Sequence, residues 1–350
     1  MFFIRADGNS EIGMGHIMRC LSIADAVKEQ GTNPVFITSC KECIPVIEQR
    51  GYQTRLLSTD YREMLSELLQ LVIILREFSD AKNLLLVDSY QVSEKYFKEL
   101  GKFVVTACLE DMGQSYPVDV LINYNIYGEK LSSYYLESIN SRPHRMLLGT
   151  AYAPLRLEFQ QGITYTLREK VTDVMITTGG GDTFFATRAF IESFLADERL
   201  QKRQIRYHII SGPFNIHAAD LKKLYANNSN IVIHENVKNM KEIMQQSDVV
   251  LTATGSTIYE VSALGVPMIA FYFVENQRQG AEEISKKTHV INCGDFQKEP
   301  ENVVKKATDS LFRCVNEKDY RELLHREEKQ LVDGQGAHRI AAALLSLLHA

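Results

Sequence analysis

Short apolar runs alternate with longer amphipathic stretches along the first 150 residues. From His16 to Glu29, the residues Ile17, Leu21, Ala24 and Val27 recur at helical spacing on one face. The predicted strands of this half are Phe2–Ala6, Pro34–Ser39, Gln53–Leu57, Leu84–Asp88, Phe103–Leu109 and Val120–Asn123, and the predicted helices are His16–Glu29, Cys43–Arg50 and Tyr61–Phe78. Continuous apolar strands between helices are typical of a parallel sheet buried on both faces.

The periodicity breaks between residues 147 and 163, where we expect the chain to cross into a second domain. A second alternating series then predicts strands at Asp173–Thr178, Arg206–Ser211, Ile231–His234, Val249–Ala253, Pro267–Phe273 and Val290–Cys293, with helices at Phe184–Leu195, Ala218–Ala226, Met240–Gln246, Ser256–Leu264 and Gln277–Lys286. The tail from Val303 is helical apart from a break at 333–336. The sequence therefore predicts an α/β chain of two Rossmann-like domains, over 1–150 and 151–333. A final helix over 334–350 could pack back on the first domain.

The composition is that of a soluble globular protein, with 45% hydrophobic and 24% charged residues among 350. A net charge of -5 without a basic stripe argues against nucleic acid as a partner. No window approaches the roughly 18 uninterrupted apolar residues of a membrane span, and the N-terminus lacks the basic start of a signal peptide. We therefore expect a cytoplasmic protein that binds no membrane, with a monomer as the default state.

Cysteine and histidine spacing gives little support to a metal site. The six cysteines are scattered, and only Cys40 and Cys43 form a C-x-x-C pair. One such pair is a weak sign of zinc or redox chemistry, and reduced thiols are the simpler interpretation. The nine histidines show neither H-x-H nor H-E-x-x-H spacing. We expect no metal and no cofactor.

A glycine-rich turn joins the first strand to the first helix. Gly8, Gly13 and Gly15 let the backbone approach a ligand closely, and the helix that begins near His16 offers unpaired N–H groups. A helix N-terminus disfavours the protonated imidazole, so we expect His16 to be in the neutral form that a general base needs. The alternative is a tight turn in which His16 only caps the helix or packs.

Two familiar phosphate motifs do not fit this turn. Gly8 to Gly13 has the Walker spacing, but Met14 and Gly15 stand where Lys and Ser or Thr would be needed. A dinucleotide fingerprint that begins at Gly13 would need a third glycine at position 18, which is Met18. Neither an ATPase motif nor a dinucleotide motif is present.

Two glycine turns in the second half repeat the strand-loop-helix pattern. One is Thr178–Asp182 and the other is Ala253–Thr257, where a helix start, its dipole and two hydroxyls come together. Either turn alone is often only a crossover, but two in one domain favour a diphosphate site.

Further polar residues follow these strands. Glu260 lies one helical turn after Ser256 and could accept ribose hydroxyls, or it could be a solvated helix glutamate. Asn276 and Gln277 could donate to sugar hydroxyls, or serve as loop and cap residues. Tyr90, in the run Asp88-Ser89-Tyr90, could stack on a sugar or pack in the core.

Several segments together resemble one family. The segment 7–21 (DGNSEIGMGHIMRCL) closely resembles the signature of the nucleotide-sugar hydrolases of pseudaminic acid biosynthesis, which remove UDP from UDP-2,4-diacetamido-2,4,6-trideoxy-β-L-altropyranose. Related spore-coat polysaccharide proteins carry similar motifs. The segment 148–159 resembles the family's mid-chain segment. The segments 255–260 and 263–267, with 276–277, resemble its nucleotide-binding region.

The resemblance implies a GT-B architecture akin to the glycosyltransferase that makes lipid II. In it, two Rossmann-like domains with parallel sheets face across a cleft, and the second holds most of the UDP. It also implies that His16 is the catalytic residue. Thr254-Gly255 departs from the two glycines that the family often has there, and the helical sequence after Val303 makes this chain longer than the shortest members. The candidate substrate-binding residues are Asp7, Gly13, Gly15, Arg19, Tyr90, Asn276 and Gln277, and the candidate nucleotide-binding residues are Gly180, Gly181, Gly255, Ser256, Thr257 and Glu260.

The expected reaction is hydrolysis of a UDP-sugar at the anomeric carbon. His16 would take a proton from water on the face opposite the UDP, giving inversion without a metal. Asp7 or a backbone carbonyl would orient the imidazole. The alternatives are a GT-B glycosyltransferase, in which an acceptor hydroxyl replaces the water, and a nucleotide-sugar sensor without turnover.

Overall fold

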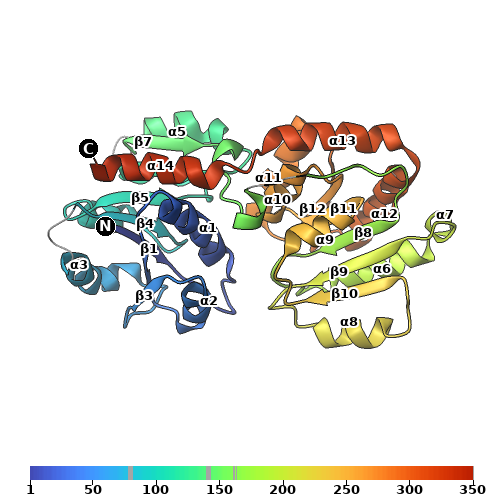
Figure 1. Ribbon diagram of the computed structural model, residues 1–350, viewed down its shortest axis with the longest axis horizontal. Coiled ribbons are helices and arrows are strands. Elements are labelled where there is room, and N and C mark those ends of the chain that lie inside the picture. Colours follow the sequence, from blue (N-terminus) through green and yellow to red (C-terminus); the bar gives the residue numbers. More distant parts are fainter. Residues whose placement is uncertain (78–81, 139–142, 161, 163, 350) are drawn as a thin grey trace. The chain divides into compact units, whose positions relative to one another are not determined.

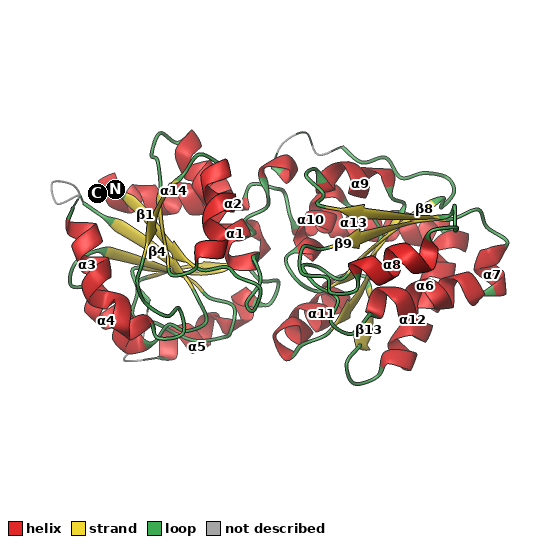
Figure 2. Cartoon of the chain, turned by 90° about the horizontal axis from the view of Figure 1, so that it is seen from below, coloured by secondary structure: helices red, strands yellow, loops and turns green. Residues whose placement is uncertain are grey.

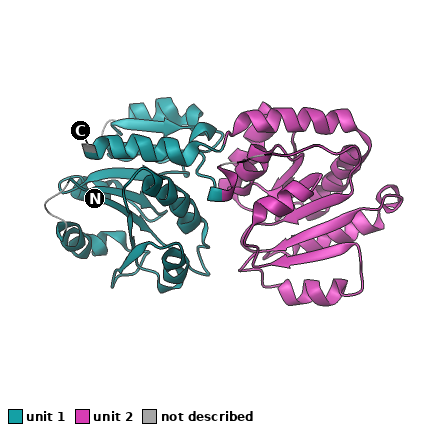
Figure 3. Cartoon of the chain, viewed as in Figure 1, with its two compact units in different colours: residues 1–157, 334–350 teal, residues 158–333 magenta. Residues whose placement is uncertain are grey.

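The computed structural model describes residues 1–77, 82–138, 143–160, 162 and 164–349. The chain forms two compact units (Figure 3). Unit 1 comprises residues 1–157 and 334–350, and unit 2 comprises residues 158–333. The chain leaves unit 1 somewhat later than the boundary expected at residue 150.

Unit 1 contains a parallel sheet of seven strands in the order β3-β2-β1-β4-β5-β6-β7 (Figure 1). The strands are β1 (Phe2–Ala6), β2 (Val35–Thr38), β3 (Gln53–Leu56), β4 (Leu84–Asp88), β5 (Val105–Leu109), β6 (Val120–Asn123) and β7 (Arg145–Leu148). All residues of β1 and β4 are buried, as expected for central strands covered on both faces. The sequence pattern did not predict β7, an edge strand that is partly exposed.

Helices cover both faces of this sheet (Figure 2). They are α1 (Gly15–Glu29), α2 (Ile44–Gln49), α3 (Leu68–Arg76), α4 (Glu94–Leu100), α5 (Ser132–Glu137) and α14 (Gly336–His349). Helices α1 and α14 pack together although they come from opposite ends of the chain. On the other face, α3, α4 and α5 contribute Leu71, Phe97 and Tyr135 to one buried cluster with Phe3 and Leu85 of the sheet.

The helix predicted over 61–78 is wrong at its start. Residues 64–67 form the 3-10 turn η2 (Met64–Glu67), α3 begins only at Leu68, and Phe78 lies outside the described residues. The physical reason is the side chain of Glu67, which is fully buried and accepts two hydrogen bonds from Arg5. This anchor holds the turn against the sheet. Further 3-10 turns are η1 (Lys41–Cys43), η3 (Gly128–Leu131), η4 (Thr150–Tyr152) and η5 (Leu157–Phe159).

Unit 2 contains a parallel sheet of six strands in the order β10-β9-β8-β11-β12-β13. The strands are β8 (Asp173–Thr177), β9 (Arg206–Ser211), β10 (Ile231–Glu235), β11 (Val249–Ala253), β12 (Met268–Tyr272) and β13 (Ile291–Asp295). The helices are α6 (Ala186–Ala196), α7 (Glu198–Gln201), α8 (Ala218–Tyr225), α9 (Met240–Gln246), α10 (Thr257–Leu264), α11 (Glu275–Lys287), α12 (Pro300–Asn316) and α13 (Lys318–Leu331). Helix α6 packs with α12, and α10 packs with α13. All strands predicted for this half are present, close to their expected ends.

Each sheet has a point where the strand order reverses, between β1 and β4 in unit 1 and between β8 and β11 in unit 2. In open α/β sheets, ligands bind outside the carboxyl ends of the strands at this point. The first reversal places the turn after β1 beside Asp88, and the second places the turns at 178–182 and 254–257 side by side. Among the helices of the described residues, none is both long and apolar enough to cross a membrane.

Candidate active site

The turn after β1 is folded tightly against the helix that follows it. A Cβ at Gly8 would lie 2.8 Å from the side chain of Ile17, so only glycine fits there without a shift. Asn9 closes the turn, because its side-chain oxygen accepts the N–H groups of Glu11 and Ile12 at 2.9 and 3.0 Å. Gly13 has a φ of 76°, which favours glycine. This loop therefore leads directly into the start of α1, which carries His16.

His16 is buried and bound to Asp88, the last residue of β4. Its Nδ1 lies 2.7 Å from Asp88 Oδ1, and the two side chains are 7% and 1% exposed. Burial alone would raise the pKa of Asp88, but attraction to Arg19 and His16 outweighs it and holds the pKa well below the usual range. A carboxylate that is ionised at neutral pH therefore lies beside the imidazole.

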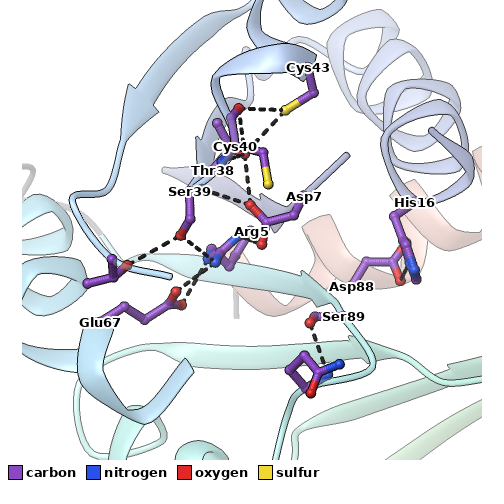
Figure 4. Close-up of polar contacts among 12 residues, drawn as sticks. Arg5, Asp7, His16, Thr38, Ser39, Cys40, Cys43, Glu67, Asp88 and Ser89 are labelled. Atoms are coloured by element: carbon purple, nitrogen blue, oxygen red, sulfur yellow. Dashed lines mark hydrogen bonds and ion pairs between the residues drawn. The ribbon is translucent and has the colours of Figure 1, made fainter. Parts of the chain in front are cut away.

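Asp7 belongs to a different cluster, which corrects the hypothesis that it orients His16. Its carboxylate accepts Arg5 Nη1 at 2.5 Å, Thr38 Oγ1 at 2.9 Å and the N–H of Ser39 at 2.7 Å. Figure 4 shows this cluster apart from the pair formed by His16 and Asp88. Asp88, and not Asp7, orients the imidazole, because the side chain of Asp7 is turned toward the buried guanidinium of Arg5. An arginine within the apolar run FFIRA was the sequence signal for this cluster.

Arg19, a candidate substrate-binding residue, directs its guanidinium into the protein. Nε and Nη2 donate to the two oxygens of Asp88 at 2.6 and 2.5 Å. Nη1 donates to Asp111 at 2.7 Å and to the hydroxyl of Tyr124 at 3.0 Å. The side chain is 10% exposed. The sequence analysis missed Asp111, although an acidic residue just after the carboxyl end of β5 was a usable signal.

Tyr90 packs against the imidazole of His16. Its ring meets that of His16 edge-on, with centroids 4.6 Å apart, and its hydroxyl lies 3.2 Å from Asp111. The residue is 45% exposed, so part of the ring is open to a ligand. A Cβ at Gly13 or Gly15 would meet no atom within 4 Å, which leaves the approach to the helix start open.

The cysteines near this site are buried thiols. The six cysteines are free, and burial raises the pKa of Cys40 to about 12. No group of three or more histidine, cysteine, aspartate or glutamate side chains suited to a metal ion occurs among the residues that the structure describes.

In unit 2, the turn after β8 interlocks with the loop after β9. Gly179 has a φ of 86°, and the oxygen of Gly180 accepts the N–H of Phe214 at 2.9 Å. A Cβ at Gly212 would lie 2.4 Å from the oxygen of Gly179, so the two loops touch through their backbones. Asp182 accepts the N–H groups of Ala186 and Thr187 and thereby caps α6.

The turn after β11 leads into α10 at Thr257. Ser256 occupies the cap position without capping the helix through its side chain, and a Cβ at Gly255 would meet no atom within 4 Å. The N–H groups of Gly255, Ile258 and Tyr259 donate to backbone oxygens within the turn, so Ser256 and Thr257 remain as the candidate donors at this helix start.

The remaining candidates lie on the two helices next to this turn. Glu260 is 7% exposed on the first turn of α10. Gln277 joins the turn to α11, because its backbone oxygen accepts the hydroxyl of Thr254 and its side-chain oxygen accepts the N–H of Phe273, both at 3.1 Å. Asn276, beside it, is exposed. The structure thus gathers the nucleotide candidates at the reversal point of the second sheet.

Comparison with known proteins gives matches over the whole chain. Residues 174–331 match the glycosyltransferase family 28 C-terminal domain. An uncharacterized protein of Methanocaldococcus jannaschii is 25% identical over 81% of this chain, which spans only 58% of that relative's length. The spore coat polysaccharide biosynthesis protein SpsG of Bacillus subtilis is 24% identical, over 98% of this chain and 97% of that protein.

A further relative is the UDP-2,4-diacetamido-2,4,6-trideoxy-beta-L-altropyranose hydrolase of Campylobacter jejuni. It is 27% identical, over 82% of this chain and 97% of its own length. Among solved structures, MurG of Acinetobacter baumannii superposes with a TM-score of 0.66 at 11% identity, covering 99% of both chains. The UDP-GlcNAc 2-epimerase of Neisseria meningitidis gives 0.65 at 13% identity, covering 99% of this chain and 100% of that one. The chain therefore has a GT-B type fold, its residues 174–331 match the glycosyltransferase family 28 C-terminal domain, and it is similar to the UDP-2,4-diacetamido-2,4,6-trideoxy-beta-L-altropyranose hydrolase of Campylobacter jejuni.

Proposed function

We propose that this protein hydrolyses a UDP-activated diacetamido-trideoxy hexose at the anomeric carbon. The products are UDP and the free sugar with inverted configuration, in a step of nonulosonic (pseudaminic) acid biosynthesis. The observation that carries the proposal is the pair formed by His16 and Asp88, 2.7 Å apart at the carboxyl end of a Rossmann-like sheet. The name of the Campylobacter relative supports the choice of sugar.

In this proposal His16 is the general base. Because Nδ1 faces Asp88, Nε2 is the ring nitrogen that accepts a proton from water. The water oxygen forms a bond to C1 while the bond between C1 and the diphosphate oxygen breaks, and the electron pair leaves with UDP. Attack on the face opposite the diphosphate inverts the configuration. The imidazolium that forms is stabilised by the carboxylate of Asp88.

Unit 2 binds the nucleotide. The backbone at Gly180 and Gly181 and the start of α10 at Gly255, Ser256 and Thr257 hold the diphosphate, and Glu260 accepts the ribose hydroxyls. Donors that meet the phosphate oxygens stabilise the charge that develops as UDP leaves. UDP is a good leaving group, so the reaction needs no strong protein acid.

The sugar contacts come from residues that stay accessible. Gly13 and Gly15 offer open space in the turn before His16, Tyr90 contacts the imidazole and is 45% exposed, and Asn276 is exposed at the start of α11. We place the protein in the cytoplasm as a monomer that binds neither nucleic acid nor membrane.

Proton NMR of the protein mixed with UDP-diacetamido-trideoxy hexoses of different configuration tests the proposal. We expect UDP and free sugar to appear without any acceptor, and the first free sugar to have the anomeric configuration opposite to that of the donor. Retention of configuration contradicts the mechanism. Tight UDP binding without turnover of any donor contradicts an enzymatic function and favours a nucleotide-sugar sensor.

A GT-B glycosyltransferase is the second candidate, because the C-terminal half matches a glycosyltransferase domain. A water molecule and an acceptor hydroxyl need the same base, so the residues of the site fit both reactions. Release of UDP that depends on an added acceptor supports the transferase, whereas release at the same rate without acceptor supports the hydrolase.

A further inference from the structure

The environment of His16 Nδ1 decides which ring nitrogen carries the proton. Nδ1 lies 2.7 Å from Asp88 Oδ1 and 3.0 Å from Arg19 Nη2. If Nδ1 carries hydrogen, it donates to the carboxylate. If it carries a lone pair, it accepts from the guanidinium, but the same lone pair then faces an anionic oxygen at 2.7 Å. That contact is repulsive, so the geometry favours the tautomer with hydrogen on Nδ1.

Arg19 fixes this tautomer by keeping Asp88 ionised. A protonated Asp88 could donate to Nδ1 and force the opposite tautomer, but the guanidinium donates to both carboxylate oxygens. A carboxylate held in this two-bond geometry stays ionised and can only accept. Nδ1 must then donate, and Nε2 keeps the lone pair that a general base uses.

Arg19 is itself fixed by a second carboxylate. Nη1 donates to Asp111, and the hydroxyl of Tyr90 lies 3.2 Å from the same Asp111 oxygen. The ring of Tyr90 in turn packs edge-on against His16. The contacts therefore form a closed network, which runs from the imidazole through Asp88, Arg19, Asp111 and Tyr90 back to the imidazole.

The charges of the cluster formed by His16, Asp88, Arg19 and Asp111 suit a base at His16. Asp88 and Asp111 carry one negative charge more than Arg19 neutralises, so a proton taken up by His16 brings the cluster to neutrality. Other titratable side chains near it are the thiols of Cys20, 3.6 Å from Asp88, and Cys108, the hydroxyls of Tyr124 on Arg19 and Tyr127 on the backbone oxygen of Asp111, and the carboxyl of Glu110. Burial raises the pKa of these thiols and hydroxyls, which keeps them neutral at pH 7, and it also raises the pKa of Glu110.

We propose that Arg19, held by Asp111 and Tyr90, is a positioning residue that sets the tautomer of His16 through Asp88, and is not a ligand of the sugar. The use of that tautomer in catalysis rests on the proposed function, whereas the tautomer itself does not.

The first test needs no substrate. Nitrogen-15 NMR of protein labelled at histidine, with His16→Asn to assign the signal, reports which ring nitrogen carries hydrogen. We expect hydrogen on Nδ1 in the wild-type protein and a shift of hydrogen to Nε2 in Asp88→Ala, where the remaining partner of Nδ1 is the guanidinium of Arg19, which can only donate. Hydrogen on Nε2 in the wild type, or an unchanged spectrum in Asp88→Ala, overturns the proposal.

The second test separates positioning from substrate binding. Arg19→Lys keeps the positive charge but loses the guanidinium that bonds both oxygens of Asp88. In this variant we expect kcat to fall by about 10²-fold while KM changes less than about threefold. Arg50→Lys is the matched control, because Arg50 is likewise paired with an aspartate, Asp25, at 2.9 Å and lies outside the site. A rise in KM at unchanged kcat assigns Arg19 to substrate binding and overturns the proposal.

Asp111→Asn keeps the shape of the partner that holds Arg19 and serves if the lysine variant does not fold. We expect the same fall in kcat at nearly constant KM, and wild-type kinetics in this variant overturn the role of Asp111. If the wild-type protein turns over no UDP-sugar, the proposed function fails while the tautomer measurement still decides the present inference.

Discussion

Replacing His16 by asparagine is the most direct test of the reaction. The side chain is 7% exposed and has two separable roles, a hydrogen bond from Nδ1 to Asp88 and the proposed action of Nε2 as the base. An asparagine amide can still donate toward Asp88, and Arg19 continues to hold both carboxylate oxygens. The variant therefore loses the base while the charge balance around it persists, so we expect the free energy of unfolding to fall by no more than about 1–2 kcal/mol.

Loss of a general base slows turnover by about 10²–10⁴-fold, which corresponds to about 2.7–5.5 kcal/mol in the activation free energy. The proposed UDP ligands lie in unit 2, so the Kd for UDP should stay within about twofold of the wild type. Continuous detection of released UDP gives kcat, and calorimetric titration gives the Kd.

The matched control is His338→Asn, because His338 also belongs to unit 1 and also bonds a carboxylate, Glu29, at 2.7 Å. This variant should keep wild-type kcat. A kcat within about threefold of wild type in His16→Asn would falsify the role of the base. A Kd for UDP that weakens as much as kcat falls would show that the substitution acts on binding or folding instead.

Three further substitutions test other parts of the structure. Gly255→Ala should weaken UDP binding about tenfold or more in a calorimetric titration, because its Cβ occupies the open space at the start of α10; Gly280→Ala, also in open space within unit 2, should leave the Kd unchanged, and equal affinity in both variants contradicts the site. Glu67→Gln should destabilise unit 1 by about 1–3 kcal/mol in urea unfolding, since one buried N–H group of Arg5 then faces an amide NH2 while Asp7 still neutralises the guanidinium. Glu94→Gln removes an exposed ion pair and should cost less than about 1 kcal/mol, so similar losses in the two variants refute the argument. Burial raises the pKa of Glu328 well above its ordinary value of 4.5, so the folded state binds more protons than the unfolded state and this side chain costs stability as the pH rises above that value. Glu328→Gln should therefore gain stability relative to the wild type between pH 5 and pH 8, and a constant difference across that range contradicts the assignment.

The fold was readable from the sequence because its information is local. Strands such as Leu84–Asp88 are continuous apolar runs, and helices such as α1 show their periodicity within a few turns. The failures are also physical. The start of α3 is set by Glu67, whose partner Arg5 lies 62 residues away in the chain. The edge strand β7 has too few buried residues to show a pattern.

The candidate site was readable only as a set of turns. The glycine turn at 8–15, the turn at 178–182 and the helix start at Thr257 could be placed at the carboxyl ends of strands from their neighbours in the sequence. Which carboxylate meets His16 could not be placed in this way. Asp7 is near in the sequence, whereas Asp88 is 72 residues distant and is brought next to the turn by the pairing of β1 with β4.

The same reasoning explains why the sequence suggested a sugar contact for Arg19. A cation one turn into a helix, next to a glycine turn, is a reasonable anion ligand when nothing else is known. Two carboxylates that arrive from β4 and from the end of β5 change this, because each forms an ion pair with the guanidinium in a site where little water competes. Removing the guanidinium from this pairing to reach a substrate would leave the buried carboxylate of Asp88 and the partly exposed carboxylate of Asp111 to repel each other. In the proposed mechanism Arg19 therefore acts on His16 and does not bind the substrate. It keeps Asp88 ionised and, through Asp88, sets the nitrogen on which His16 receives its proton.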